Sequence, residues 1–403
     1  MVTQHDPESV GFSTARLNRI RPAMQAYIDE DKYPGLITLI ARHGKVVHHE
    51  SFGLMNIEAQ QPMRPDAICS VLSMTKPVTS VAALMLFEQG FFQLNDPIEQ
   101  FLPAAKDLKV CDPTTDADFK LVDLVRRPTM RDLFTHTAGF AYWPPEGHPL
   151  IKRFEGFGFQ PSTTLQEYVQ TFLAVPLLHQ PGSLWRYGPS HDVLAHIVEV
   201  IAGMPFDEFV RHNISEPLGM VDTDFVVPEH KVDRLASVYA PNDAGGHRRT
   251  GPEPADYRAP RAAYGGDRLY STATDYARFV QMLINGGQLD GVRLLGRKTV
   301  DLMLTNHLPP SVMPSFDVVD LSKGYYTKGY GMGLGVRVMM NPAENEIPGS
   351  VGNFSWSGGW NTYFWGDPHE GLIGIIWAQS QQRMYRYPLE RQFMTLAYQA
   401  LVD

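Results

Sequence analysis

The feature that most restricts the fold is a helical stretch from Ser73 to Gly90 that is apolar on nearly every face. Where a surface helix would carry a polar stripe, this one carries Val78, Val81, Ala82, Ala83, Leu84, Met85, Leu86 and Phe87. A helix without a polar stripe has to be covered on all sides by other elements. Pro77 is compatible with it in the first turn, where backbone N–H groups lack helical partners in any case. The sequence therefore predicts a central, buried helix that starts close to Ser73.

Strands are predicted near both ends of the chain, and helices between them. Residues 36–42 and 46–53 read as an antiparallel hairpin, and strands are predicted at 331–339, 352–356, 361–365 and 372–378. The helical candidates are 14–28, 192–203, 205–214, 273–285, 297–305 and 389–402. This order indicates an α+β fold, with an antiparallel sheet flanked by helices and a second, mostly helical lobe.

A chain of 403 residues exceeds one usual hydrophobic core. We therefore expect one lobe built from both chain ends, residues 1–72 and 325–403, and a mainly helical lobe of residues 73–324. A cleft between two lobes is the usual place for a ligand, so the active site is expected there.

Composition excludes several classes of partner. The net charge is -9 with a pI near 5.9, which provides no basic surface for nucleic acid or anionic membrane. No apolar run approaches the roughly 20 residues that span a bilayer. The start of the chain lacks the pattern of a signal peptide, and there are two cysteines, Cys69 and Cys111, so a cytoplasmic location is expected. The oligomeric state is not indicated.

No metal or other cofactor is expected. His48, His49 and Glu50 are consecutive, and neighbours on a strand point to opposite faces of the sheet. The spacing of a helical zinc motif is absent as well. His136 and His191, which lie near other polar motifs, are interpreted as structural histidines with satisfied hydrogen bonds.

Ser73 and Lys76 are the first candidates for chemistry. In S-x-x-K on a helix, residues i and i+3 share a face, so a hydroxyl and an amine can meet. A serine hydroxyl is a weak nucleophile until a base accepts its proton. A lysine can accept that proton only as a neutral amine, and burial among apolar groups favours the neutral amine over the ammonium. Alone, the pattern also fits a helix-capping serine followed by a lysine that extends to solvent.

Two later segments complete the pattern. Tyr187 lies in a loop directly before a predicted helix, where a tyrosine can act as general base and then acid. Residues 354–362 form a strand with small residues, which lets a substrate approach the backbone closely. The N–H groups of Ser73 and Gly359 are then candidates for an oxyanion hole. The alternatives are a tyrosine that packs in a turn and a glycine bulge.

These three elements resemble the family VIII carboxylesterases, the esterase branch of the serine β-lactamase and penicillin-binding-protein superfamily, near the class C β-lactamases. Ser73 and Lys76 match the first family motif, Tyr187 matches the second, and Trp356, Ser357 and Gly358 stand in the third. Further stretches that agree are 133–139, 269–273, 285–287 and 290–295. The resemblance runs from about residue 10 to the C-terminus and implies a β-lactamase-like fold.

Two departures from the lactamase pattern indicate the substrate class. Pro189 replaces the asparagine of the second motif, and Trp356 replaces the lysine of the third. Without that lysine, the carboxylate of a penicillin or a D-alanyl peptide has lost a natural partner. Ser357 replaces a glycine that is common among the esterases, with no effect that we can assign. Both departures favour neutral esters over anionic lactams.

The resemblance therefore implies a serine carboxylesterase that hydrolyses short-chain neutral esters through an acyl-enzyme on Ser73. Whether Lys76 or Tyr187 is the primary base stays open, because two coupled groups share the proton. A β-lactamase or D-alanyl peptidase, an acyltransferase that uses the same acyl-enzyme, and an inactive binding protein are the alternatives. Trp356, Ser357 and Gly358 are expected to line the substrate site. Tyr142 and Trp143, in an aromatic loop, either wall the substrate pocket or pack between lobes.

Overall fold

The computed structural model describes residues 3–112, 120–142, 164–242, 245–251, 262–312, 328–382 and 386–403. Trp143, predicted to bind substrate, lies outside the described residues, as does the predicted lobe boundary at residue 325. The division into two lobes at the predicted boundaries stays a prediction.

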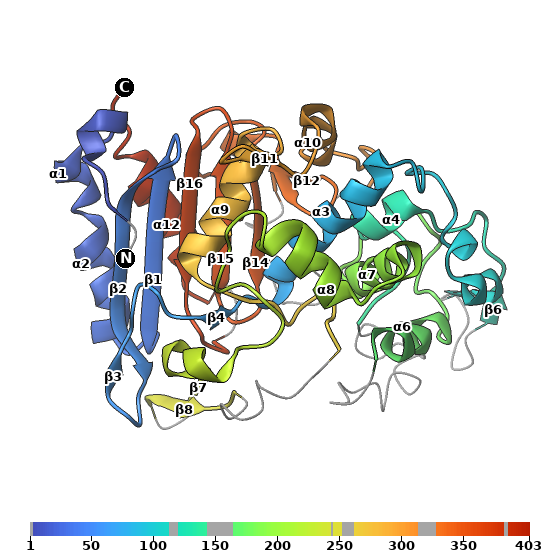
Figure 1. Ribbon diagram of the computed structural model, residues 1–403, viewed down its shortest axis with the longest axis horizontal. Helices are drawn as coiled ribbons and strands as arrows, with labels where there is room; N and C mark the ends of the chain where they lie inside the picture. Colours follow the sequence, from blue (N-terminus) through green and yellow to red (C-terminus); the bar gives the residue numbers. More distant parts are fainter. Residues whose placement is uncertain are drawn as a thin grey trace.

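An eight-stranded antiparallel sheet runs through one half of the molecule, and both ends of the chain contribute to it (Figure 1). Its order is β12-β13-β14-β15-β16-β1-β2-β3. The strands are β1 (Gly35–Arg42), β2 (Lys45–Asn56), β3 (Gln61–Pro62), β12 (Tyr330–Met332), β13 (Arg337–Met339), β14 (Phe354–Gly358), β15 (Thr362–Asp367) and β16 (Leu372–Trp377). The two ends of the chain meet where β1 pairs with β16, in a register that places Ile37 opposite Trp377.

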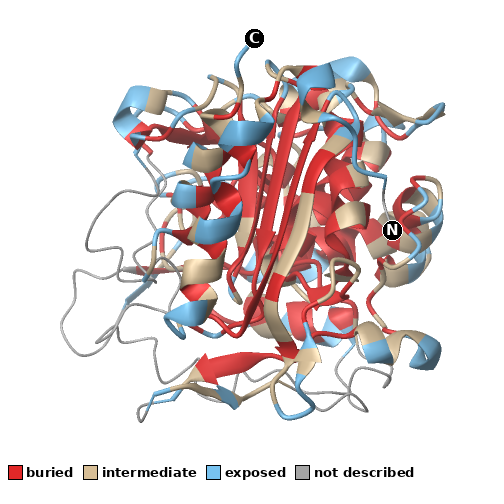
Figure 2. Ribbon diagram, turned by 90° about the vertical axis from the view of Figure 1, so that its left-hand side faces the viewer, coloured by how far each residue is buried: buried red, intermediate tan, exposed pale blue. Residues whose placement is uncertain are grey.

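Helices cover both faces of this sheet, which is why its central strands are buried throughout (Figure 2). One face packs against α1 (Thr14–Leu17), α2 (Ile20–Asp29) and α12 (Leu389–Tyr398). The other packs against α9 (Ala273–Ile284), whose Tyr276 ring lies 5.1 Å from that of Phe364. The predicted α+β class, an antiparallel sheet flanked by helices, is confirmed.

The helix α3 (Thr75–Glu88) is the centre of the helical part, as its sequence predicts. Every residue of α3 from Thr75 to Leu84 is buried, and Pro77 occupies the first turn. The helix packs against α7 (Ser190–Ala202), α8 (Phe206–Val210) and the π-helical turn η5 (Arg211–Ser215). Further out lie α4 (Met130–Phe134) and α6 (Leu165–Leu173), both of which contact α7.

The remaining elements are short. They are the 3-10 turns η1 (Pro7–Val10), η2 (Leu72–Met74), η3 (Ile98–Gln100), η4 (Pro103–Asp107) and η6 (Glu229–Arg234), the helices α10 (Arg297–Met303) and α11 (Pro342–Asn345), and the strand pairs β4 (Cys69–Ser70) with β9 (Tyr270–Ser271), β5 (Val110–Asp112) with β6 (Lys120–Val122), β7 (Tyr239–Pro241) with β8 (His247–Arg249), and β10 (Gln288–Leu289) with β11 (Val292–Arg293). No helix among the described residues is long and apolar enough to cross a membrane.

Two predicted elements are divided in the structure. Residues 331–339 form the hairpin β12–β13 instead of one strand, because Gly335 takes a left-handed φ of 89° that reverses the chain. Residues 14–28 form α1 and α2 with a break before Pro22, as expected for a proline inside a helical pattern, because its ring would clash with the carbonyl four residues earlier in one continuous helix.

We expect His48, on β2, to make the protein less stable in acid. His48 is buried, its Nε2 lies 2.7 Å from Thr38 Oγ1, and burial lowers its pKa to about 3. Between the unfolded value of 6.5 and about 3, only the unfolded state takes up the proton. Unfolding free energy from this residue therefore decreases as pH falls below 6.5, by up to about 1.4 kcal/mol per pH unit.

We expect His48→Gln to flatten the pH dependence of stability, measured by urea unfolding between pH 7 and 4. The exposed His230→Gln is the control and should keep the slope of the unaltered protein. Parallel stability curves for His48→Gln and the unaltered protein would contradict the assignment.

Candidate active site

The turn η2 presents Ser73 immediately before the central helix. Leu72 has a left-handed φ of 45°, a strained conformation for a residue with a branched side chain. The turn is held by Thr75, whose Oγ1 donates to the Leu72 carbonyl at 2.6 Å. Gly358 of β14 lies so close that a Cβ there would collide with the Val71 carbonyl. The glycine of the third motif is thus required by packing against the turn that carries Ser73.

Ser73, Lys76 and Tyr187 converge on one oxygen atom. The Tyr187 hydroxyl donates to Ser73 Oγ at 2.5 Å, and Lys76 Nζ donates to the same oxygen at 3.3 Å. Lys76 Nζ also lies 4.7 Å from the centre of the Tyr187 ring. Lys76 is completely buried, whereas Ser73 and Tyr187 are half-buried, so a substrate can reach the serine. Ser73 precedes α3 and Lys76 lies in its first turn, a small change from the predicted common helix.

Lys76 has a second partner that the sequence patterns did not indicate. Its Nζ donates to the carbonyl of Gly266 at 2.6 Å, in a segment that packs between α3 and α7. A signal was present, because Gly265 and Gly266 are adjacent and each lacks room for a side chain. The amine is thereby fixed between the nucleophile and a backbone acceptor.

A set of rings surrounds Tyr187. The ring centres of His136, Tyr142 and Trp356 lie 5.0, 5.8 and 6.2 Å from that of Tyr187. His136 is stacked on Trp356 with an interplanar angle of 8°. These rings restrict the orientation of Tyr187 and keep its hydroxyl at Ser73.

His136 and His191 are expected from the sequence to be structural histidines with satisfied hydrogen bonds, and only His191 has such a bond. His191 Nε2 lies 3.1 Å from Ser80 Oγ, whereas neither ring nitrogen of His136 has a hydrogen-bond partner within the described parts of the chain. Burial, followed by the charge of Lys76, lowers the pKa of His136 well below its usual value. The His136 ring is therefore neutral at neutral pH and acts on Tyr187 through packing.

The predicted substrate-binding residues differ in exposure. Trp356 is buried beneath His136 and Tyr187, Ser357 is half-buried, and Gly358 is buried against Val71. Gly359 is exposed in the turn after β14, where an added Cβ would lie 3.5 Å from Leu72 Cδ1. Gly359 is thus next to the turn that carries Ser73, and its role as an oxyanion donor stays a prediction.

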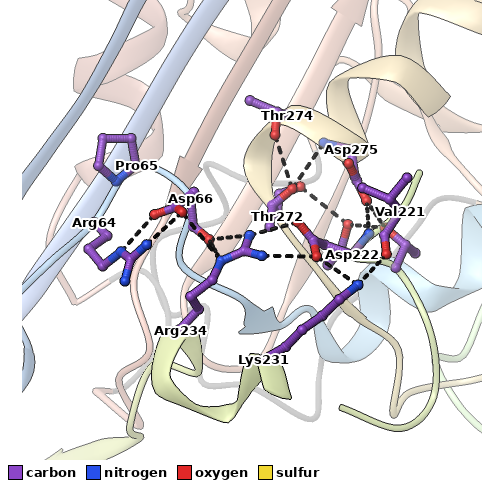
Figure 3. Close-up of polar contacts among 12 residues, drawn as sticks. Arg64, Pro65, Asp66, Val221, Asp222, Lys231, Arg234, Thr272, Thr274 and Asp275 are labelled. Atoms are coloured by element: carbon purple, nitrogen blue, oxygen red, sulfur yellow. Dashed lines mark hydrogen bonds and ion pairs between the residues drawn. The ribbon is translucent and has the colours of Figure 1, made fainter. Parts of the chain in front are cut away.

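Ion pairs anchor the chain that leads to Ser73 (Figure 3). Arg234 forms two hydrogen bonds with the Asp222 carboxylate, at 3.0 and 2.6 Å, and donates to the carbonyl of Asp66 at 2.8 Å. Lys231 pairs with Asp222 as well, at 2.9 Å. The backbone N–H of Asp222 donates to Asp275 at the start of α9. Because Asp66 precedes β4, which continues into η2, these bonds fix the path of the chain into the site.

The site defines the class of protein. A half-buried serine that is hydrogen-bonded to a buried lysine and a tyrosine, at the start of a central helix beside an antiparallel sheet, is the arrangement of a serine hydrolase with the β-lactamase fold. Acyl transfer through the serine is the chemistry that such an arrangement can perform. No group of three or more metal-binding side chains occurs in the described parts of the chain.

The comparisons with known proteins place this class in a family. The profile of the beta-lactamase family matches residues 20–399, and the chain belongs to that family. It is 32% identical over 349 residues to Protein Rv1367c from Mycobacterium tuberculosis (strain ATCC 25618 / H37Rv), a match that covers 86% of this chain and 85% of the relative.

Two relatives connect the family to hydrolase chemistry. Esterase EstB of Burkholderia gladioli is 27% identical over 399 residues, with 92% of each chain covered. The solved structure of EstCE1, described as a hydrolase with promiscuous acyltransferase activity, superposes with a TM-score of 0.78 at 25% identity. It covers 95% of this chain and 99% of EstCE1. The predicted resemblance and enzyme class are confirmed, and the protein is a serine hydrolase of the β-lactamase fold.

Proposed function

We propose that the protein is a serine carboxylesterase of the family VIII type, which hydrolyses short-chain neutral esters through an acyl-enzyme on Ser73. The observation that carries the proposal is the pair of hydrogen bonds on Ser73 Oγ, one from Tyr187 and one from Lys76. A hydroxyl between two groups that can accept and return a proton is arranged for attack on a carbonyl carbon.

The reaction follows from these contacts. Ser73 Oγ bonds to the carbonyl carbon while its proton passes to the Tyr187–Lys76 pair, and the N–H groups of Ser73 and Gly359 bind the oxyanion. The C–O bond to the alcohol then breaks, and the same pair returns the proton to the leaving alkoxide. A water molecule attacks the acyl-enzyme in the same way and releases the acid and Ser73.

The neutral character of the substrate is supported by the third motif. The side chain at its first position, Trp356, is buried in a stack with His136, where a lactamase would present a lysine. Lys76 is fully buried, and its amine is bonded to the carbonyl of Gly266 and to Ser73, so it is not available to bind a carboxylate of the substrate. A carboxylate on the substrate would therefore lose its hydration without gaining a lysine at this position.

We expect p-nitrophenyl acetate and butyrate to be hydrolysed with a kcat/KM at least about 1,000-fold above that for nitrocefin, because transition-state binding of an anionic lactam lacks its charge partner. Rates measured at pH 7.5 for acyl chains of 2, 4, 8 and 12 carbons test the short-chain preference. Nitrocefin turnover equal to that of the butyrate ester would contradict the proposal in favour of a β-lactamase.

Acyl transfer to an alcohol is the second candidate function. The chain is similar to EstCE1, a hydrolase with promiscuous acyltransferase activity. Both activities use the same acyl-enzyme, and the acceptor decides between them. Chromatography of the products formed with added 1-butanol separates the two: butyl butyrate in excess of butyrate would identify a transferase, and butyrate alone a hydrolase.

A further inference from the structure

Asp192 is a buried carboxylate close to the site that the proposed reaction does not use. It lies in the first turn of α7, five residues after Tyr187, and is only 1% exposed. Its Oδ1 accepts the backbone N–H of Gly266 at 2.8 Å, and its Oδ2 accepts the Tyr142 hydroxyl at 2.9 Å. Burial of a carboxylate costs free energy unless hydrogen bonds compensate for the lost hydration. The two hydrogen bonds of Asp192 provide that compensation and fix the orientation of its carboxylate.

Gly266 joins this carboxylate to Lys76. Its N–H donates to Asp192 and its carbonyl accepts from Lys76 Nζ at 2.6 Å. The preceding carbonyl, of Gly265, accepts from Thr79 Oγ1 at 2.7 Å. The two glycines are therefore held from α3 by Thr79 and from α7 by Asp192, and in return they hold the amine of Lys76.

The packing around Gly266 leaves little freedom. A Cβ at this position would lie 2.6 Å from Asp192 Oδ2 and 2.6 Å from the Tyr142 hydroxyl. Burial raises the pKa of Asp192, and the proximity of Lys76 and the two hydrogen bonds oppose this shift. Asp192 and Lys76 thus belong to one buried cluster, linked through the backbone of Gly266.

We propose that Asp192 is a positioning residue: through Gly266 it orients the carbonyl that holds the Lys76 amine against Ser73. The inference rests on the proposed function, since its effect is read as a rate of acyl transfer. Asp192 is bonded to Gly266 and Tyr142 and not to Ser73 among the bonds of the described residues, so we expect it to act on the rate through Lys76.

The test compares Asp192→Ala and Asp192→Asn with a matched pair at Asp367. Asp367 is also fully buried and also accepts a backbone N–H, from His369 at 3.1 Å, and a tyrosine hydroxyl, from Tyr398 at 2.8 Å. It lies at the end of β15 and has no contact with Ser73, Lys76 or Tyr187 among the bonds of the described residues. Asp367→Ala and Asp367→Asn therefore report the general cost of losing such a carboxylate.

For hydrolysis of p-nitrophenyl butyrate by folded enzyme, we expect Asp192→Ala to lower kcat about 100-fold with KM within about 3-fold, the size of effect that follows from a misplaced catalytic group. Asp192→Asn should recover at least about a tenth of the unaltered rate, since an amide oxygen can still accept the Gly266 N–H. Both Asp367 variants should keep kcat within about 3-fold, whatever they do to the melting temperature.

Three outcomes would overturn the proposal: a kcat of Asp192→Ala close to that of the unaltered protein, a loss equal to that of Asp367→Ala, or no recovery in Asp192→Asn. Failure of the proposed function gives a different result, because the unaltered protein would then hydrolyse no ester, or would do so equally well after Ser73→Ala.

Discussion

We expect the Ser73→Ala variant to lose ester hydrolysis by about 10⁴-fold or more in kcat, because no acyl-enzyme can form without the hydroxyl. In the structure, Ser73 Oγ is the atom at which the hydrogen bonds from Tyr187 and Lys76 meet. Alanine removes that atom alone and leaves the strained turn at Leu72 and the packing of Gly358 unchanged. The kcat for p-nitrophenyl butyrate, measured against the uncatalysed rate, gives the size of the loss.

The matched control for this variant is Ser80→Ala. Ser80 lies on the same buried helix, and its Oγ is hydrogen-bonded to His191 Nε2 at 3.1 Å rather than to the site. The same chemical change there should leave kcat within about 3-fold of the unaltered value. A hydroxyl that takes no part in the reaction affects the stability of the protein and not its turnover. If Ser73→Ala retained activity similar to that of Ser80→Ala, the nucleophile would have to be sought elsewhere.

The second large effect is expected for Tyr187→Phe. Phenylalanine keeps the ring that packs against His136 and lies over the Lys76 amine, but it removes the hydroxyl that bonds to Ser73. Loss of one general acid–base group lowers kcat by about 10²–10⁴-fold. KM should change little, because the ring that contacts neighbouring side chains is still present. Stopped-flow measurement of p-nitrophenol release separates acylation from deacylation in the variant.

Tyr363→Phe is the control for the tyrosine. Tyr363 is buried in β15, and its hydroxyl donates to Asn361 at 3.0 Å, away from Ser73. Its loss should lower stability and leave kcat unchanged. Equal activity of Tyr187→Phe and the unaltered protein would assign the proton transfer to Lys76 alone, and would contradict the shared role described above.

Much of the fold was predictable because local patterns in the sequence determine its helices and strands. The buried helix α3, the hairpin β1–β2 and the strands β14 to β16 follow from hydrophobic periodicity and turn residues, which act over a few positions. The convergence of Ser73, Lys76 and Tyr187 was predictable for a different reason. Each lies in a short motif, and the motifs occur in a characteristic order, so a resemblance could bring together residues that are 114 positions apart.

The contacts that support the site were not predictable in this way. The hydrogen bond that the Gly266 N–H donates to Asp192 spans 74 positions, and its donor is part of the backbone, which carries no side-chain signal. Arg234, which fixes the chain before β4, reads in the sequence as an ordinary surface charge. The break of residues 331–339 into two strands depends on the left-handed φ of Gly335, and the lack of room for a side chain there comes from Ser80, again in a distant part of the chain.

The central claim, an acyl-enzyme on Ser73, is tested most directly by covalent trapping with a p-nitrophenyl alkylphosphonate. Attack of Ser73 Oγ on phosphorus expels p-nitrophenolate and leaves a phosphonate ester that mass spectrometry of the digested protein can locate. We expect one adduct per chain, on the peptide that contains Ser73, formed in parallel with loss of esterase activity and much more slowly in Tyr187→Phe. An adduct on another residue, or loss of activity without modification of Ser73, would contradict it.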